Sequence, residues 1–472
     1  MNRSDSFITF KKTNYIQMKN KFNIFYIFLF VLITAACDSF LEVQPVNDVS
    51  DENTIYDKAS ANTALRGTYR QLASSGYYGE NFVTLAYYPS GDIKCLTTGV
   101  ILNLVNWDFR ADNANLNSFW NAAYNTINRA NHVIQKVPLV ADANFTDAER
   151  TTLVGEATFI RALAYFDLAR TFGGVQIYLL PTDDLNSRPS ISRSSLAETY
   201  EQVLKDLEEA EKLLSENVNR IRATKQTVWA LRSRLHLYQK KWDLAEVYAT
   251  KLIDRTTSYK LVYPFADWFK NNVIGTTESI FELQYSAQNP STIRSQMQHP
   301  TAGGTYRYAP NDNFVGLLNN PTKGGARKAL IGSVTQNNTT LWFGNLYYRL
   351  QATDPAYIFR IAEMYLIRAE ARAQQGHLED ALEDLNVIRQ RADLTVTLSS
   401  DKQVILDAID QERRYEFAFE AHRWFDLTRT GRYMTLIPLL DPTIKVDEHE
   451  NLFPIPVAQL DLDDKLEQNP GY

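Results

Sequence analysis

Apolar residues recur at helical spacing in two segments, 227–253 and 363–389, which repeat each other in register. Each segment predicts a helix, a short polar turn (residues 239–241 or 375–377) and a second helix. Five key positions have the same spacing in both segments. They are Trp229, Ser233, Ala245, Ala249 and Leu252 in the first segment and Tyr365, Ala369, Ala381, Leu385 and Ile388 in the second. Two such matches in one register indicate helical-repeat units.

An aromatic residue, a small residue four positions later and an alanine twelve positions after that are typical of a tetratricopeptide repeat. Two looser helix pairs precede these units, residues 156–172 with 196–214 and residues 53–72 with 118–137, and a further helix is predicted over 403–429. Because a single repeat cannot bury its apolar face alone, we expect the pairs to stack on one another. The predicted fold is mainly α, a tetratricopeptide-like scaffold of about four helix pairs.

Two stretches interrupt the helical pattern. Residues 259–355 and 76–117 are rich in Gly, Asn, Thr and Tyr and show little helical periodicity. Long loops on a rigid scaffold are usually functional rather than connective. We therefore expect a scaffold over residues 53–258 that contains the 76–117 insertion, a loop-rich ligand-binding insertion at 259–355, and scaffold with the C-terminal segment over 356–472.

The N-terminal 36 residues are typical of a secretory signal peptide. A lysine-bearing stretch ends at Lys21, an apolar run follows over residues 22–33, and small residues at 34–36 precede Cys37. The apolar run is shorter than the roughly 20 residues that a spanning helix needs. We therefore expect residues 1–36 to be removed.

Cys37 is the expected site of lipidation. A cysteine directly after small residues resembles a bacterial lipobox, in which the thiol is acylated, although Thr34 stands where leucine is usual. Met18 opens a complete signal sequence of its own and is the expected true start, and residues 37–52 would form the lipidated tether. An ordinary signal peptide followed by an incidental cysteine is the alternative.

The net charge and the cysteine content argue against several classes of partner and site. The chain carries 49 basic and 55 acidic side chains, a formal charge of −6; without residues 1–36, 44 basic and 54 acidic ones remain, a charge of −10. Such a surface repels polyphosphate, which argues against a nucleic-acid partner and leaves the lipid as the membrane anchor. If Cys37 is acylated, Cys95 is the one thiol left, so neither a disulfide framework nor a thiolate metal site is expected.

The sequence contains no zinc-protease helix motif, nucleophile elbow, phosphate-cradling loop or EF-hand spacing, and we expect no enzyme and no metal site. The densely charged residues 412–426 are interpreted as structural. Arg413 with Glu416, and Glu420 with Arg423, lie three positions apart, so each pair could meet on one helix face and lock helices together.

Several blocks in this chain match the SusD/RagB-type nutrient-uptake lipoproteins of the Gram-negative outer membrane, in the expected order over nearly the whole mature chain: CDSFLE at 37–42, RALAYFDLAR at 161–170 with FGG at 172–174, MYLIRAEA at 364–371, ERRYEFAFE at 412–420, HRWFDL at 422–427, LFPIP at 452–456 and QNPGY at 468–472. The chain thus resembles that family. The resemblance implies a surface lipoprotein with four tetratricopeptide-like repeats and a loop-rich ligand-binding portion. It implies a TonB-dependent, SusC-like barrel transporter as partner and glycans, or in some relatives peptides, as ligands. Asp38 and Glu42 after the cysteine suit the export signal of this lineage.

Sugar binding needs flat aromatic rings for the apolar face of a pyranose, and amide, acidic, basic or backbone groups for its hydroxyls. The insertions supply both, at Tyr77, Tyr78, Asp92, Lys94, Asn106, Trp107, Tyr306, Arg307, Tyr308, Asn311, Trp342, Tyr347 and Tyr348. Trp107 is the first candidate, because the resemblance implies an aromatic residue in that loop that stacks on the ligand. For each of these residues, packing inside the protein is the alternative to ligand contact. Five other tryptophans occupy helical or apolar positions and are expected in the core: Trp120, Trp229, Trp242, Trp268 and Trp424.

The leading hypothesis is a non-catalytic protein that captures an oligosaccharide and delivers it to an outer-membrane transporter. One alternative within the same type of complex is a peptide or another nutrient as ligand. Another is a tetratricopeptide-repeat adaptor of the cell envelope. No cofactor is expected, and whether a calcium ion stiffens a loop stays open.

Overall fold

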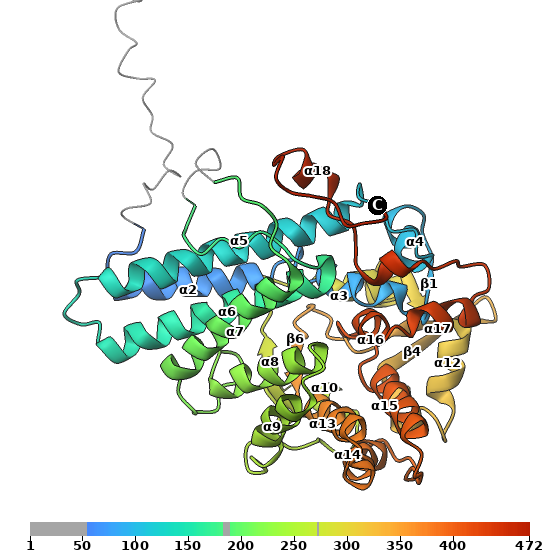
Figure 1. Ribbon diagram of the computed structural model, residues 1–472. Coiled ribbons are helices and arrows are strands. Elements are labelled where there is room, and N and C mark those ends of the chain that lie inside the picture. Colours follow the sequence, from blue (N-terminus) through green and yellow to red (C-terminus); the bar gives the residue numbers. More distant parts are fainter. Residues whose placement is uncertain (1–53, 183–188, 271–272) are drawn as a thin grey trace, which may run out of the picture. The chain divides into compact units, whose positions relative to one another are not determined.

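The computed structural model describes residues 54–182, 189–270 and 273–472, and residues 55–472 form one compact unit. The predicted signal peptide, Cys37 and the 37–52 tether lie outside the described residues. Helices dominate the unit (Figure 1), which confirms the predicted fold class. The predicted domain boundaries stay a prediction.

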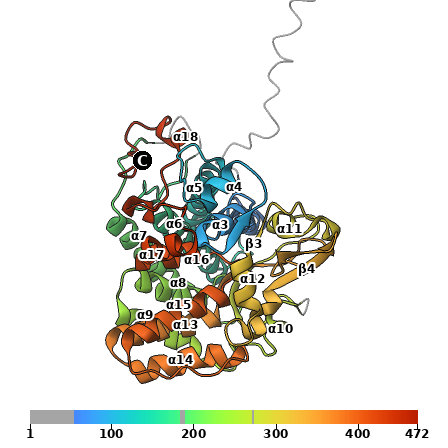
Figure 2. The ribbon, with the colours of Figure 1, turned by 90° about the vertical axis from the view of Figure 1, so that its right-hand side faces the viewer.

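Four helix pairs build the scaffold, and they are the pairs expected from the sequence: α2 (Lys58–Leu72) with α5 (Ala114–Lys136), α6 (Asp147–Phe172) with α7 (Leu196–Leu213), α8 (Lys225–Tyr238) with α9 (Trp242–Ile253), and α13 (Ile361–Gln375) with α14 (Leu378–Arg391). The pairs also stack, since α5 packs on α6 and α9 packs on α13 (Figures 1 and 2). Stacking buries the apolar face that one pair would leave exposed.

Small side chains let the repeat helices approach closely. Ser233, Ala245, Ala369 and Ala381 are all fully buried. The Ser233 hydroxyl donates to the Ala245 carbonyl at 2.9 Å, which joins α8 to α9 through the positions that the repeat pattern singled out. A larger side chain at these positions would push the helices apart.

Helix α6 begins at Asp147, nine residues before its predicted start at 156. A capping box explains the earlier start, because the Thr146 hydroxyl accepts from the Glu149 amide and the Glu149 carboxylate accepts from the Thr146 amide. The helix ends at Gly173, whose φ of 81° is readily reached by glycine.

The prediction of a single helix over residues 403–429 is wrong. The structure has α15 (Lys402–Glu416) and α16 (Arg423–Thr430), separated by residues 417–422. Phe419 adopts a left-handed conformation with φ 68°, and its ring packs against Tyr87 and Phe314 at centroid distances of 5.3 and 6.5 Å. Burial of this ring outweighs the helical periodicity of the segment.

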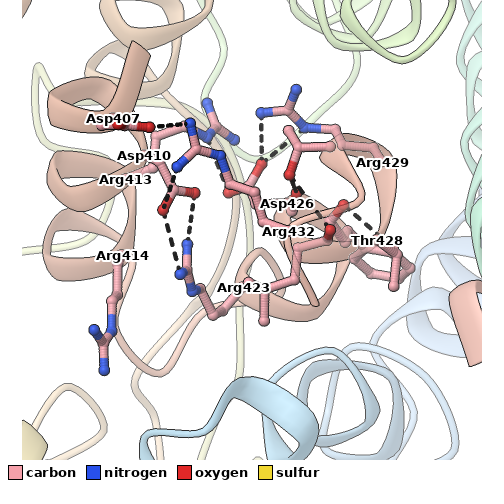
Figure 3. A network of polar contacts seen from close by, with 12 residues as sticks. Asp407, Asp410, Arg413, Arg414, Arg423, Asp426, Thr428, Arg429 and Arg432 are labelled. Carbon is pink, nitrogen blue, oxygen red and sulfur yellow. Dashed lines mark hydrogen bonds and ion pairs between the residues drawn. The ribbon is translucent and has the colours of Figure 1, made fainter. Parts of the chain in front are cut away.

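Charged groups tie α15 to α16 across that break, in pairs other than the predicted ones. Arg413 donates to Asp426 at 2.9 Å and Arg423 donates to Asp410 at 2.8 Å (Figure 3). The expected pairs, Arg413–Glu416 and Glu420–Arg423, are not the ones formed. The second pair required a helix that continues through residues 417–422, whereas Arg413 and Glu416 both lie within α15 and bind other partners instead.

Glu416 and Glu420 instead bind arginines from distant elements. Arg327 donates to Glu416 at 2.9 Å, and Arg360 donates to Glu416 at 3.1 Å and to Glu420 at 2.6 Å. Arg391 also pairs with Glu416. All of these groups are buried, so the charged block is structural, as interpreted from the sequence.

The two predicted insertions meet in a loop layer that contains more regular structure than expected. Its three two-stranded antiparallel sheets are β1 (Ile93–Cys95) with β3 (Tyr308–Pro310), β2 (Ser279–Leu283) with β6 (Ala356–Arg360), and β4 (Ile331–Gln336) with β5 (Thr339–Gly344). The β1–β3 sheet joins the 76–117 stretch to the 259–355 stretch. Short helices complete the unit: α3 (Asn81–Leu85), α4 (Val100–Val105), α10 (Asp267–Lys270), α11 (Ile293–Met297), α12 (Asp312–Asn319), α17 (Tyr433–Leu440) and α18 (Val457–Leu460).

Candidate ligand-binding surface

Six of the predicted ligand-binding residues lie in the core and not on an open surface: Tyr77, Tyr78, Asp92, Trp107, Tyr308 and Tyr347, each at most 2% exposed. As predictions of accessible ligand contacts, these six are corrected by the structure. In each case a partner distant in the sequence explains the burial.

Tyr77 and Tyr78 bind the same buried carboxylate. Their hydroxyls donate to Asp167 at 2.8 and 2.7 Å, and Arg170 donates to that carboxylate as well. The two rings stack with centroids 4.9 Å apart. Burial, and next the negative charge of Asp167, raise the pKa of both hydroxyls well above its usual value, so they stay protonated donors that hold α6 to the loop layer.

Trp107 packs inside the loop layer. Its indole Nε1 donates to the Pro89 carbonyl at 3.0 Å, and its ring stacks on Tyr433 of α17 with centroids 5.5 Å apart and planes 3° from parallel. The stack that the family resemblance suggested for a sugar is therefore made with a protein side chain.

Asp92 and Tyr308 are also structural. The Asp92 carboxylate accepts from Arg414 Nε at 2.9 Å, which anchors β1 to α15. The Tyr308 ring meets Tyr88 edge to face at 4.8 Å, and every residue of β3 is buried. Two further residues predicted from the sequence are also structural: Asn311 caps α12 by accepting from the Phe314 amide at 2.9 Å, and the Tyr347 carbonyl accepts from Gln298 Nε2 at 3.1 Å while the residue is buried.

Tyr306, Arg307 and Trp342 remain partly accessible, and the structure brings them together. The Tyr306 hydroxyl donates to the Trp342 carbonyl at 2.8 Å, which links the segment before β3 to β5. The Arg307 carbonyl accepts from the Leu96 amide at 2.8 Å, which links the same segment to β1. Residues from both predicted insertions thus contribute to one surface.

Lys94 and Asp312 extend this surface with opposite charges. Their side chains form an ion pair of 2.6 Å and stay 41% and 88% exposed. Partial burial raises the pKa of Tyr306, and the negative charge of Asp312 raises it further, which places Asp312 within electrostatic reach of that ring. We call Lys94, Tyr306, Arg307, Asp312 and Trp342 the loop-layer patch. Asn106 is exposed at the end of α4, and no contact among the described residues joins it to the patch.

Two hollows in the scaffold were not predicted, and none of the predicted ligand-binding residues lines them. The arginine hollow, of about 930 Å³, lies between α2, α5, residues 221–222 and residues 283–292. The α16 hollow, of about 760 Å³, lies between α8, α9, α13, α15 and α16. Each draws its lining from elements far apart in the sequence, which explains why local patterns did not reveal them.

The α16 hollow is lined by charges that neutralise one another. Arg432 donates to Asp407 at 2.6 Å (Figure 3). Arg429 donates to Glu370 at 2.6 Å. Trp242, expected in the core, also lines this hollow and is only partly buried; the other four tryptophans assigned to the core are buried.

Two sequence-family descriptions match this chain. One, "Starch-binding associating with outer membrane", covers residues 39–237, and the other, "SusD family", covers residues 344–472. The chain belongs to the SusD/RagB family. Members of this family are non-catalytic binding proteins, which agrees with the lack of catalytic motifs in the sequence.

Relatives match this chain over nearly their whole length, and those with solved structures share its fold. SusD-like protein P38 of Formosa agariphila is 26% identical, in an alignment that covers 96% of this chain and all of the relative. A SusD superfamily protein of Bacteroides thetaiotaomicron VPI-5482 is 24% identical with a TM-score of 0.76, over 87% of this chain and 99% of that one. A laminarin-binding SusD-like protein is 22% identical with a TM-score of 0.76, over 89% of this chain and all of that one.

Within residues 54–182, 189–270 and 273–472, no helix of this SusD-family chain is long and apolar enough to cross a membrane. The same ranges contain no cluster of three or more His, Cys, Asp or Glu side chains that could hold a metal ion. The Cys95 thiol is partly buried and donates to the Thr97 carbonyl at 2.9 Å.

Proposed function

We propose that this SusD-family protein captures a glycan at the bacterial outer membrane and passes it to a SusC-like, TonB-dependent transporter. Acyl chains on Cys37 hold it at the membrane, facing the cell exterior. The description of the matching family as starch-binding and outer-membrane-associated supports this role, as does the fold shared with a laminarin-binding relative.

The loop-layer patch is the proposed glycan site, and the Tyr306–Trp342 hydrogen bond is the observation that carries the proposal. That bond ties the Tyr306 side chain to the backbone of Trp342, and both aromatic side chains are partly accessible. Aromatic rings can stack on the C–H face of a pyranose, while Arg307, Lys94 and Asp312 can bind its hydroxyls. Affinity is expected to be modest, because a sugar exchanges hydrogen bonds to water for similar ones to protein. Modest affinity suits a protein that must release its cargo.

Calorimetry on the chain without its lipid tests this site. The probes are laminari-oligosaccharides, malto-oligosaccharides and a set of peptides. We expect a glycan to bind, and Trp342→Ala to weaken its binding at least tenfold. Tyr56→Ala is the matched control, since Tyr56 is an exposed aromatic residue, 66% accessible, at the start of α2. Binding of peptides alone would support a peptide as the nutrient. Unchanged glycan affinity in Trp342→Ala would show that the loop-layer patch is not the glycan site.

The anchor and the partner need separate tests. Cys37→Ala should release the protein from the membrane fraction. A pull-down from detergent-solubilised membranes should recover a barrel transporter. Recovery of a soluble periplasmic complex instead would favour the adaptor alternative.

A further inference from the structure

The arginine hollow shares no lining residue with the loop-layer patch. It opens beside the C-terminal half of α2, where α2 and α5 lie side by side (Figure 1), and the segment after β2 closes its other side. Its volume of about 930 Å³ falls in the range of small-molecule sites, which hold roughly 300–1,000 Å³. The hollow is therefore large enough for several sugar rings.

Four arginines line the hollow: Arg66, Arg70, Arg129 and Arg222. Arg66 and Arg70 lie one turn apart on α2 and so share a helix face. Arg129 reaches the same place from α5, because its Nη1 lies 3.5 Å from where a Cβ on Gly67 would stand. The Arg129 guanidinium thus lies against the surface of α2 at position 67, between its two arginines in the sequence.

In the part of the chain that the structure describes, one of these four arginines is paired with an acid. Arg222 donates to the buried Glu156 at 2.5 and 2.9 Å, and Tyr69 donates to the same carboxylate. By contrast Arg66 donates to the Thr63 hydroxyl at 2.7 Å, and within the described ranges neither Arg70 nor Arg129 forms an ion pair.

Among the described residues that line the arginine hollow none is acidic, in a chain whose formal charge is −6. The α16 hollow shows the opposite arrangement, since Arg413, Arg429 and Arg432 are each paired with an acid there. Unpaired guanidinium groups that converge in a concave site favour an anionic ligand.

We propose that the arginine hollow binds an acidic oligosaccharide, through its sulfate or carboxylate groups. The inference rests on the proposed function and names a class of glycan for the protein. Guanidinium groups present paired N–H donors that match the oxygens of these anions. Tyr69 and Tyr285 supply aromatic surface in the same hollow, and the exposed amides of Gln284 and Asn289 can bind sugar hydroxyls.

The test compares Arg70→Gln/Arg129→Gln with the control Lys205→Gln/Lys212→Gln on α7. Both double variants remove two exposed positive charges, so the net charge is matched. The calorimetric probes are an oligogalacturonate, a sulfated galactan oligosaccharide, its desulfated counterpart and sodium sulfate alone. We expect at least one acidic oligosaccharide to bind, with a Kd at least tenfold higher in the arginine variant and within twofold of wild type in the control. Binding should weaken from 50 to 300 mM NaCl, since salt screens charge pairs.

Three results would overturn the inference: no binding of either acidic probe, equal affinity in the arginine variant, or sodium sulfate binding as tightly as the oligosaccharides. The last result would indicate a simple anion site. The proposed function fails separately. If Trp342→Ala loses a neutral glycan while the arginine variant binds every probe like wild type, the loop-layer patch is supported as the glycan site and the arginine hollow is refuted as an acidic-glycan site. If the arginine variant loses the acidic glycan while Trp342→Ala keeps all binding, the arginine hollow is supported and the loop-layer patch is refuted.

Discussion

Replacing Trp107 by alanine should destabilise the fold rather than abolish a sugar contact. The side chain is 2% exposed, so nearly its whole surface leaves water on folding. A buried aromatic side chain of roughly 200 Å² contributes about 5 kcal/mol at 25 cal/mol per Å². Loss of the indole hydrogen bond to Pro89 adds about 1 kcal/mol, while relaxation of the site lowers the total. We expect a loss of about 3–5 kcal/mol, the usual range for such truncations.

Urea unfolding of the lipid-free chain, followed by tryptophan fluorescence and circular dichroism, measures this loss. Trp342→Ala is the matched comparison, because that tryptophan is only partly buried and should cost less than half as much. Trp107→Phe should fall between wild type and Trp107→Ala, since it keeps a ring against Tyr433 but loses the indole donor. A Trp107→Ala variant that unfolds at the wild-type urea concentration but no longer binds glycan would refute this reasoning and restore Trp107 as a ligand contact.

The remaining predictions concern the buried charges and the repeat interface. Neighbouring arginines lower the pKa of Glu416 from 4.5 to about 2, against the effect of its burial, so its contribution to stability is complete above pH 4.5 and is lost as the pH falls toward 2. Glu416→Gln should therefore lower the melting temperature strongly at pH 7 and only slightly at pH 2.5; equal losses at both pH values would contradict the assignment. Arg360→Ala removes the arginine that three buried carboxylates share, those of Glu278, Glu416 and Glu420, and should cost about 3–5 kcal/mol in urea unfolding; a loss below 1 kcal/mol would show that the network is dispensable. Ser233→Leu should lower the melting temperature by several degrees because the side chain would separate α8 from α9, and an unchanged melting temperature would argue against close packing there.

Local patterns in the sequence predicted the scaffold because its contacts are largely local. The offsets from Trp229 to Leu252 describe one helix pair whose two helices meet through residues twelve positions apart, such as Ser233 and Ala245. The prediction failed for the helix over 403–429, where burial of Phe419 against Tyr87 sets the backbone conformation. No periodicity within that segment contains this information.

The candidate site was predicted only in part, for the same reason. Composition correctly located aromatic residues in the two insertions, but whether a ring faces solvent depends on distant partners. Tyr77 is buried because its hydroxyl donates a hydrogen bond to Asp167 of α6. Trp107 is buried because the ring of Tyr433 of α17 stacks on its indole ring. The arginine hollow likewise joins Arg66 of α2 to Arg129 of α5. Such contacts are visible only in the folded chain.

A crystal structure of the lipid-free chain with an oligosaccharide that it binds in calorimetry tests the central claim most directly. For a neutral glycan, the account predicts sugar density against the rings of Trp342 and Tyr306, with Arg307 hydrogen-bonded to its hydroxyls. Trp107 should keep its stack on Tyr433 in that complex. Sugar density in another place, with the loop-layer patch unchanged and open to solvent, would contradict the account.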